Sequence, residues 1–380
     1  MLSRVLVAGL NCRPVAVSAK KFIPEVYVVD YFGDVDLKRA ADGVYSIGKE
    51  YSLDRLLKRT KKVIGRVKPE GVLLTSELGC NPDTVREVGY SCKIIGNGFE
   101  QVNSVREWKG FFHTLDKLGI KHPKTILVDK IMNVEWACKT IGFPLVTKPL
   151  HGSSGQGVRL IHSLKEALTE FDKYKRILIQ EYVRGVNASV SVISTGADAT
   201  AVSLNEQLLG KNEFGQENQF GYCGNIVPLE SRLERKARED AETICREFKL
   251  VGSVGIDMVL ADQPYVIEVN PRFHDTLECI ERAYDINLVK AHIEAIGGIL
   301  PTVGKSGKTY AKSILFADGR LKIAGNLENV EGAADIMREG AIVERGNPVC
   351  SAIAEGKDRD AALSSLNDKI ITLKKCFRRI

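Results

Sequence analysis

The sequence predicts a chain of mixed α/β and α+β class, with parallel βαβ units at the N-terminus, a mixed central block and a β-rich C-terminal region. Strand-like and helix-length segments alternate over the first hundred residues, which is the pattern of parallel βαβ units. The central block has more strand-like than helical stretches, which favours an antiparallel sheet. Four strand-like stretches and a last helix follow residue 300.

The first region contains the strand-like stretches RVLVAGL, EVYVVD, GVLLT and CKIIG, with a helical stretch at 53–67. Gly9 follows the first stretch, a helix is expected near Pro14, and Asp30 closes the second stretch, as at the start of a dinucleotide site. The segment GLNCRP lacks the G-x-G-x-x-G fingerprint, which disfavours nicotinamide or flavin binding. We expect a Rossmann-like scaffold that binds a substrate group or nothing.

The central block begins with a helix at 103–119, followed by a strand, a helix at 134–141 and the strand PLVTKP. Ser163 and Glu166 have capping-box spacing before the helix LKEALTEFDKY. The strand-like stretches RILIQEYV, ASVSVIS and AVSLNEQLL follow, and a helix at 230–248 precedes the last pair, VGIDMVL and YVIEVN. Beyond them YAKSILFA, LKIAG, AIVERG and CSAIAEG are strand-like.

Charge and cysteine usage exclude several classes of partner. The 380 residues carry a formal net charge of +6, from 54 basic and 48 acidic residues without a block of like sign, which does not argue for nucleic acid. No run approaches the roughly 18 apolar residues of a membrane span, and the apolar run of MLSRVLVAGL is too short for a signal peptide. The 9 cysteines are scattered without a C-x-x-C pair, which favours reduced thiols. We therefore expect a cytoplasmic protein without nucleic-acid or membrane partners.

The segment VGIDMVLADQPYVIEVNPR is the most informative part of the sequence. If it forms a hairpin whose turn is centred between Asp262 and Gln263, Asp257 faces Glu268 at roughly 5 Å, and Asn270 lies on the same face. The opposite face is then wholly apolar, which fixes the register. That apolar face consists of Val254, Ile256, Met258, Leu260, Tyr265, Ile267 and Val269.

Two opposed carboxylates repel each other unless positive charge lies between them. Asp257, Glu268 and the amide oxygen of Asn270 form a set of hard oxygen ligands that suits Mg²⁺, with phosphates as further ligands. The alternative is a solvated face on which two acids happen to be opposed. Arg272 follows Pro271 at the end of the strand, and its permanently charged guanidinium suits a transferring phosphoryl group.

The stretch KPLHGSSGQGV is a glycine-rich loop with Lys148 before it rather than after it, so it is not a P-loop. Lys148 ends an apolar strand, where an ammonium needs an anion. The loop offers successive backbone N–H groups that can close over phosphates, although many such loops are only flexible hairpins. The later stretch ILIQEYVRG is a strand whose connection could bind an adenine edge.

The order of these features resembles the ATP-grasp superfamily over essentially the whole chain. The lysine, the flap, QEYV and D…E-x-N-P-R carry the resemblance, and GLNCRPVAVSA with VYVVDYFGDVDL is similar to an archaeal-type, carboligase-like branch among the carboxylate–amine ligases. It implies a Rossmann-like pre-ATP-grasp domain at 1–102, an ATP-grasp domain at 103–300 and a β-rich C-terminal region at 301–380. The grasp domain would divide into a flap subdomain at about 120–183 and a metal-carboxylate subdomain at about 184–300.

The resemblance also implies residue roles for binding ATP and Mg²⁺, with Mn²⁺ as an alternative metal. Asp257, Glu268 and Asn270 would hold the metal, and Arg272 would stabilise the acylphosphate transition state. Asn187 replaces the acidic residue that binds ribose in the family, and the first lysine of the family falls on Lys109 or Arg106. The remaining nucleotide contacts would come from Lys148, Ser153, Ser154, Gly155, Glu181, Tyr182 and Val183.

The function that the resemblance implies is ATP-dependent ligation. A small-molecule carboxylate would be activated as an acylphosphate and joined to an amine, with release of ADP and phosphate. The alternatives are a carboxylase-like enzyme that uses bicarbonate and a non-catalytic ATP-binding regulator. Tyr222, Asn225 and His274 are candidates for the acceptor pocket, although the first two could lie in a surface loop and His274 could be structural. A homodimer would be usual for the superfamily.

Overall fold

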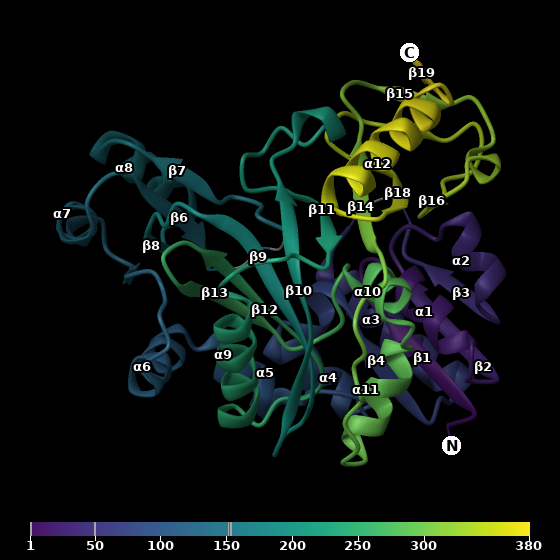
Figure 1. The fold of residues 1–380 in the computed structure, drawn as a ribbon, viewed down its shortest axis with the longest axis horizontal. Helices are drawn as coiled ribbons and strands as arrows, with labels where there is room; N and C mark the ends of the chain where they lie inside the picture. Colours follow the sequence, from purple (N-terminus) through teal and green to yellow (C-terminus); the bar gives the residue numbers. More distant parts are fainter. Residues whose placement is uncertain (1, 49–50, 151, 153) are drawn as a thin grey trace.

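The computed structural model describes residues 2–48, 51–150, 152 and 154–380 of the chain (Figure 1). Its first region is a four-stranded parallel sheet of order β3-β2-β1-β4, as expected for a Rossmann-like domain. Its strands and helices are β1 (Arg4–Ala8), α1 (Arg13–Lys20), β2 (Glu25–Asp30), α2 (Val35–Ala40), β3 (Gly43–Ser46), α3 (Leu53–Val67), β4 (Gly71–Leu74), the 3₁₀ turn η1 (Ser76–Gly79), α4 (Pro82–Gly89) and α5 (Phe99–Arg106).

The stretch CKIIG, expected as a strand, makes only one isolated bridge, between Val72 and Ile94. The stretch follows shortly after α4, and its backbone turns away from the sheet at Gly96, where the φ of +140° suits glycine. It therefore touches the edge of the sheet without extending it.

The flap subdomain is a four-stranded antiparallel sheet of order β5-β8-β6-β7. One of its faces packs under α7 and α8, and Lys148 lies on strand β6. Ser163 caps α8 as its spacing predicts, because its hydroxyl accepts the Glu166 N–H at 3.3 Å and Glu166 accepts the His162 N–H at 3.1 Å. The elements are α6 (Trp108–Leu118), β5 (Thr125–Val128), η2 (Ile131–Asn133), α7 (Val134–Ile141), β6 (Leu145–Pro149), β7 (Arg159–Ile161), α8 (Leu164–Tyr174) and β8 (Ile177–Glu181).

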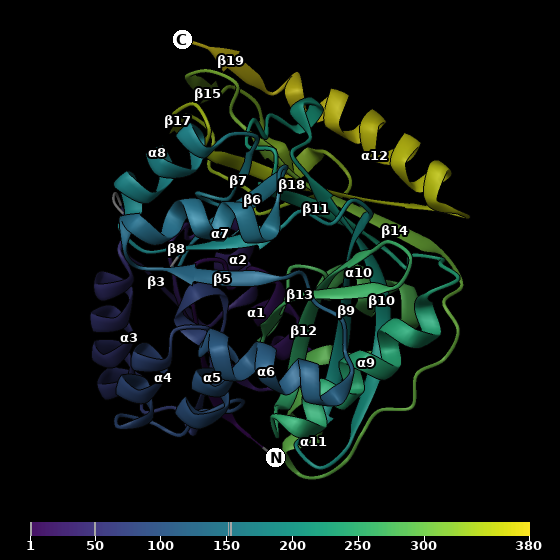
Figure 2. The ribbon, with the colours of Figure 1, turned by 90° about the vertical axis from the view of Figure 1, so that its left-hand side faces the viewer.

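An eight-stranded antiparallel sheet of order β13-β12-β9-β10-β11-β14-β18-β16 forms the body of the molecule (Figures 1 and 2). The C-terminal strands β14 and β18 continue the sheet that the central strands begin, because β14 pairs with β11. The proposed boundary at residue 300 thus lies within one sheet. The elements are β9 (Val186–Thr195), β10 (Ala199–Leu209), η3 (Asn212–Phe214), β11 (Tyr222–Val227), α9 (Glu234–Glu247), β12 (Val251–Leu260), β13 (Pro264–Asn270), α10 (Leu277–Tyr284), α11 (Leu288–Ile296), β14 (Thr309–Phe316), β16 (Ala333–Ala334), β18 (Pro348–Gly356) and α12 (Arg359–Lys374).

A small three-stranded sheet, β17-β15-β19, lies beside the C-terminal helix α12. Its strands are β15 (Leu321–Ile323), β17 (Ile342–Val343) and β19 (Phe377–Arg379), with the turn η4 (Leu327–Asn329) between the first two. Figure 1 shows α12 and this sheet at one end of the molecule and the flap subdomain projecting at another. None of the helices in the described part of the chain has the length and apolarity that a membrane crossing requires.

The hairpin of β12 and β13 has the expected register at the end that carries the acids. Asp257 pairs with Glu268, and Gly255 pairs with Asn270. The core-facing side chains around them are buried, as the alternation predicts. The register prediction is therefore confirmed for this half of the hairpin.

The other half of the hairpin is shifted by a β-bulge. Met258 pairs with Val266, so Ile267 is the extra residue in β13 and the turn is centred on Asp262 itself. Val266 is fully buried, whereas Tyr265 and Ile267 are partly exposed. The expectation that Tyr265 and Ile267 face the core was wrong, because the bulge reverses the alternation below the acids.

Buried charges join the three regions. Lys312 on β14 is fully buried and its ammonium lies 2.7 Å from Asp275 and 3.2 Å from Glu278. Arg13 at the start of α1 contacts the same Glu278, at 2.8 Å between Nη1 and Oε1, and contacts Asp335 at 2.7 Å. The network thereby connects the first domain, the segment after β13 and the C-terminal region.

We predict that Lys312→Met destabilises the protein by about 3–5 kcal/mol, because Asp275 loses its cation and Glu278 keeps only Arg13. Lys308→Met is the matched control, since Lys308 pairs with Glu355 where both side chains are about half exposed, 56% and 49%. The control should cost less than about 1 kcal/mol. Urea unfolding of both variants measures the difference, and equal losses would contradict the role of the network.

Candidate active site

The two opposed carboxylates form a cluster with two amide side chains. The Asn270 amide donates through Nδ2 to Asp257 and to Glu268, at 3.1 Å in each case. Gln207 on β10 donates through Nε2 to the other oxygen of Asp257 at 2.9 Å. The structure therefore brings the three predicted metal ligands together, and it adds Gln207, which the sequence analysis did not single out.

Cations from other elements surround this cluster. Arg106, at the end of α5, reaches Glu268 at 3.8 Å and donates to Asn270 Oδ1 at 3.3 Å. Lys148 on β6 and Arg272 also act electrostatically on these acids. Positive charge from the first domain, the flap subdomain and the hairpin end thus converges on one pair of acids.

The charges in the cluster shift the pKa values of its members. Burial and the facing Glu268 carboxylate raise the pKa of Asp257 to about 8. Burial also disfavours ionised Glu268, but the charges of Arg106 and Lys148 outweigh it and lower its pKa. Burial lowers the pKa of Lys148, whose charge the two acids favour. The pair therefore shares one proton at neutral pH. A bound metal cation can displace that proton.

Of the two cations considered for the first lysine of the family, the structure brings Arg106 to the acids. Lys109 is exposed in the first turn of α6, and its backbone N–H bonds the capping side chain of Glu107 at 3.3 Å. Helix α6 starts after a break at Glu107, so the two candidate cations do not share a helix face. We keep Arg106 rather than Lys109 in the proposed site.

The described part of the flap rests on the loop at 215–225. The Tyr222 N–H donates to the Ser154 carbonyl at 3.2 Å, and the Asn218 side chain donates to the Gly155 carbonyl at 2.8 Å. Gly155 has a φ of +77°, and a Cβ there would lie 1.9 Å from the carbonyl oxygen of Phe220. Only glycine fits this contact. Ser153, also expected in the flap, lies outside the described residues.

The expected adenine-binding segment lies between β8 and β9. The Glu181 backbone N–H donates to the Lys124 carbonyl at 2.9 Å, and the Glu181 carboxylate accepts the Lys124 N–H at 3.1 Å. An adenine contact from Glu181 would therefore use its carbonyl, with the partly exposed Tyr182 and Val183 beside it. Asn187 follows on β9 and is also partly exposed.

The acceptor candidates separate into two places. Asn225 donates to the Tyr222 hydroxyl at 2.7 Å, and that hydroxyl donates to Asp275 at 3.3 Å, so both residues join the buried Lys312 network. His274 instead packs into the interior against Gly255, where a Cβ would lie 0.8 Å from its ring.

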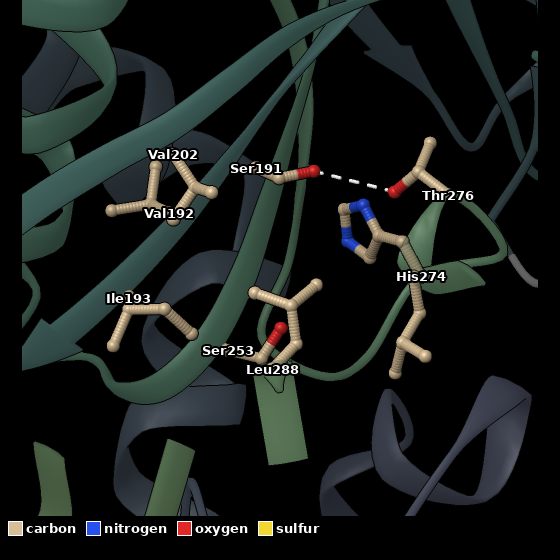
Figure 3. Close-up of a pocket in the computed structure, with 9 residues that line it drawn as sticks. Ser191, Val192, Ile193, Val202, Ser253, His274, Thr276 and Leu288 are labelled. Atoms are coloured by element: carbon tan, nitrogen blue, oxygen red, sulfur yellow. Dashed lines mark hydrogen bonds between the residues drawn. The ribbon is translucent and has the colours of Figure 1, made fainter. Parts of the chain in front are cut away.

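Figure 3 shows the His274 ring in a small cavity beside the hydrogen-bonded pair of Ser191 and Thr276, whose hydroxyls are 3.3 Å apart. Burial and the charge of Arg272 lower the pKa of His274 to about 3, so the ring is neutral. The structure thus favours the structural role for His274 that the sequence left open.

A family model described as an ATP-grasp domain matches residues 109–276. The central part of the chain therefore carries an ATP-grasp domain. An uncharacterized protein of Methanocaldococcus jannaschii is 28% identical to this chain over 93% of it and 88% of that protein. A formate-dependent phosphoribosylglycinamide formyltransferase of Saccharolobus solfataricus is 23% identical over 92% of the chain and 93% of that enzyme.

Other relatives share only part of their length with this chain. The carbamoyl phosphate synthase large chain of Clostridium acetobutylicum is 24% identical over 62% of the chain, which spans 23% of that enzyme. A biotin carboxylase of Campylobacter jejuni, solved as a complex with ATP, matches the fold with a TM-score of 0.81 at 15% identity. That match covers 100% of the chain and 92% of the carboxylase, and it shows the shared fold alone.

We predict that Gly155→Ala releases the flap from the loop, because its Cβ would collide with the Phe220 carbonyl. Gly142→Ala is the control, since it has a similar positive φ of +89° with nothing within 4 Å. Hydrogen exchange of the Tyr222 amide reports the contact directly, with about tenfold faster exchange for each 1.4 kcal/mol lost. Unchanged Tyr222 protection in Gly155→Ala would show that the flap is not held there.

Proposed function

We propose that the protein is an ATP-dependent, ADP-forming ligase that activates a carboxylate as an acylphosphate and joins it to an amine. The observation that carries this proposal is the convergence of three cations, Arg106, Lys148 and Arg272, on the opposed acids Asp257 and Glu268. A site that bound only adenine would need neither the acids nor so many cations. The match of residues 109–276 to an ATP-grasp domain supports the proposal.

In the proposed site, Asp257, Glu268 and Asn270 would hold Mg²⁺. The donor set fits this metal, because carboxylate and amide oxygens are hard ligands. The acid pair already shares a proton, whose place the metal would take. The Asn270 amide now turns its Nδ2 toward the acids, so as a ligand it would present Oδ1 there instead. Mg²⁺ would neutralise charge on the phosphates of ATP.

The remaining groups bind and orient ATP. Lys148 and Arg106 would contact phosphate oxygens from two sides, and the backbone of Ser154 and Gly155 would cover them. Arg272 would neutralise charge on the transferring phosphoryl group. There is little covalent chemistry for these residues to do, so positioning and charge neutralisation supply the rate.

The reaction balances in two steps. An oxygen of the substrate carboxylate attacks the γ-phosphorus, the bond to ADP breaks, and the acylphosphate remains. The amine nitrogen then attacks the acyl carbon, phosphate leaves with the C–O bond pair, and the nitrogen loses one proton. The Tyr222, Asn225 and Asp275 cluster is the proposed acceptor side, because it joins a hydroxyl, an amide and a carboxylate, and Asp275 follows Arg272 by three residues.

A carboxylase-like enzyme that uses bicarbonate is the second candidate, and the opposed acids Asp257 and Glu268 with the cations around them favour it over a non-catalytic regulator. ADP release measured with carboxylate and amine pairs, and separately with bicarbonate, distinguishes the two candidates. Dependence on both a carboxylate and an amine supports the ligase. ADP release with bicarbonate alone would favour the carboxylase-like enzyme over the ligase. The cytoplasmic location and the homodimer stay predictions.

We predict that MgATP raises the melting temperature of the wild type but not of Glu268→Ala. A nucleotide at about a hundred times its dissociation constant adds roughly 2.7 kcal/mol of stability. Asp262→Ala is the control, because Asp262 is an exposed acid in the turn of the same hairpin. A thermal-shift titration with and without Mg²⁺ measures the effect. Equal shifts in wild type and Glu268→Ala would exclude the carboxylate pair as the metal site.

We also predict that metal binding tightens as the pH rises. The metal displaces the proton that the acid pair shares, and the pKa of Asp257 is raised to about 8. Below this pKa the affinity should therefore increase about tenfold per pH unit. Electron paramagnetic resonance of free Mn²⁺, at a fixed ATP concentration and between about pH 6 and 7.5, measures this metal affinity. The Asp257→Asn variant has no proton for the metal to displace at this position. Its metal affinity should therefore be weaker and should not change with pH.

A further inference from the structure

A thiol from the first domain lies among the proposed catalytic groups. Cys80 follows η1 and precedes Asn81, the N-cap of α4. Arg272 donates through Nε to the Cys80 sulfur at 3.0 Å, and the sulfur lies 3.6 Å from Asn270 Oδ1. Cys80 also acts on Arg106, whose pKa it helps to raise. Cys80 thus contacts Arg272 and one proposed metal ligand, Asn270.

The contact leaves Arg272 little freedom. Its Nε donates to the Cys80 sulfur, and its Nη1 donates to the Phe273 carbonyl at 2.8 Å. With these two nitrogens held, the guanidinium plane is fixed at two of its corners. A transferring phosphoryl group would then meet an arginine that is oriented before the reaction, which lowers the cost of reorganisation.

The segment that carries Cys80 is itself held firmly. The N–H groups of Cys80 and Asn81 both donate to the Glu77 carbonyl at 3.0 Å. The Thr84 hydroxyl donates to the Leu78 carbonyl at 2.8 Å. An isolated bridge between Thr75 and Phe273 fastens this strand end to the segment next to Arg272. The sulfur is therefore placed by a rigid turn rather than by a mobile loop.

Other cysteines show that this environment is specific. Six of the 9 cysteines are buried, and Cys80, Cys92 and Cys376 are partly exposed. The Cys92 sulfur contacts a backbone carbonyl, that of Pro69, at 3.5 Å. Cys376 lies at the C-terminal end of the chain beside the core of that region. These two thiols provide internal references for the reactivity of Cys80.

We propose that Cys80 is a positioning residue, through which the first domain orients Arg272 for phosphoryl transfer. The proposal rests on the ligase function above and goes beyond it, since it gives the first domain a part in the chemistry. The residue acts through Arg272 and not on the substrate. It also makes the site sensitive to thiol reagents of the haloacetamide class.

The first experiment uses the wild-type protein and iodoacetamide. The sulfur displaces iodide from the reagent, and the thiol proton goes to the buffer. Peptide mass mapping follows Cys80, Cys92 and Cys376 while Mg²⁺-dependent ADP release is assayed in the same samples. We expect activity to fall in step with Cys80 modification, and MgATP to slow modification of Cys80 at least fivefold without changing the other two. Loss of activity that follows Cys92 or Cys376 would overturn the proposal.

The second experiment separates positioning from a structural role. Cys80→Ala should lower kcat for ADP release at least tenfold and change the KM for ATP less than twofold. Cys80→Ser should restore part of kcat, because a hydroxyl still accepts from Arg272, and it should resist iodoacetamide. Cys92→Ala is the matched control and should keep wild-type kcat. A Cys80→Ala enzyme with wild-type kcat would overturn the positioning role.

The outcomes also distinguish the two proposals. A wild type that releases no ADP in the presence of Mg²⁺ overturns the ligase function and the role of Cys80 with it. A wild type that turns over ATP, beside an equally active Cys80→Ala variant, overturns only the role of Cys80.

Discussion

The constraint on which the site depends is the fixed opposition of Asp257 and Glu268. Strand pairing places these carboxylates face to face, and the apolar side of the hairpin prevents a shift that would separate them. Like charges held this close are tolerable only with positive charge around them. Arg106, Lys148 and Arg272 supply it from three different parts of the chain. The first domain, the flap subdomain and the hairpin are therefore joined electrostatically at one point.

A second set of buried charges holds the frame around that point. Arg13 and Lys312 share Glu278, so the first helix of the chain and a C-terminal strand meet on one carboxylate. Burying such groups is costly unless each has its partner, so the network favours one docking arrangement of the three regions over many similar ones. The C-terminal region therefore contacts the first domain through charge: Asp335 pairs directly with Arg13, and Lys312 pairs with the Glu278 carboxylate that Arg13 also contacts.

The sequence was sufficient for what depends on local pattern. Alternation along the hairpin located the pair of Asp257 and Glu268, and glycine content located the flap. The bulge at Ile267 was not predicted, because a bulge inserts one residue without changing the composition of the strand. Beyond the bulge, the alternation of buried and exposed side chains is the reverse of the one extrapolated from the acids. Cys80 and Gln207 could not be found at all. Their importance arises from contacts with residues that lie 50 or more positions away, and no spacing records such contacts.

Tyr222 connects the flap with the acceptor side. Its backbone N–H bonds the Ser154 carbonyl of the flap, while its hydroxyl bonds Asp275 in the buried network. A movement of the flap away from the loop therefore disturbs the backbone of a residue whose side chain lies on the proposed acceptor side. An acylphosphate is hydrolysed if water reaches it before the amine does. Because Tyr222 belongs to both, closure of the flap and ordering of the acceptor side would occur together. The acylphosphate would then be shielded from water while it waits for the amine.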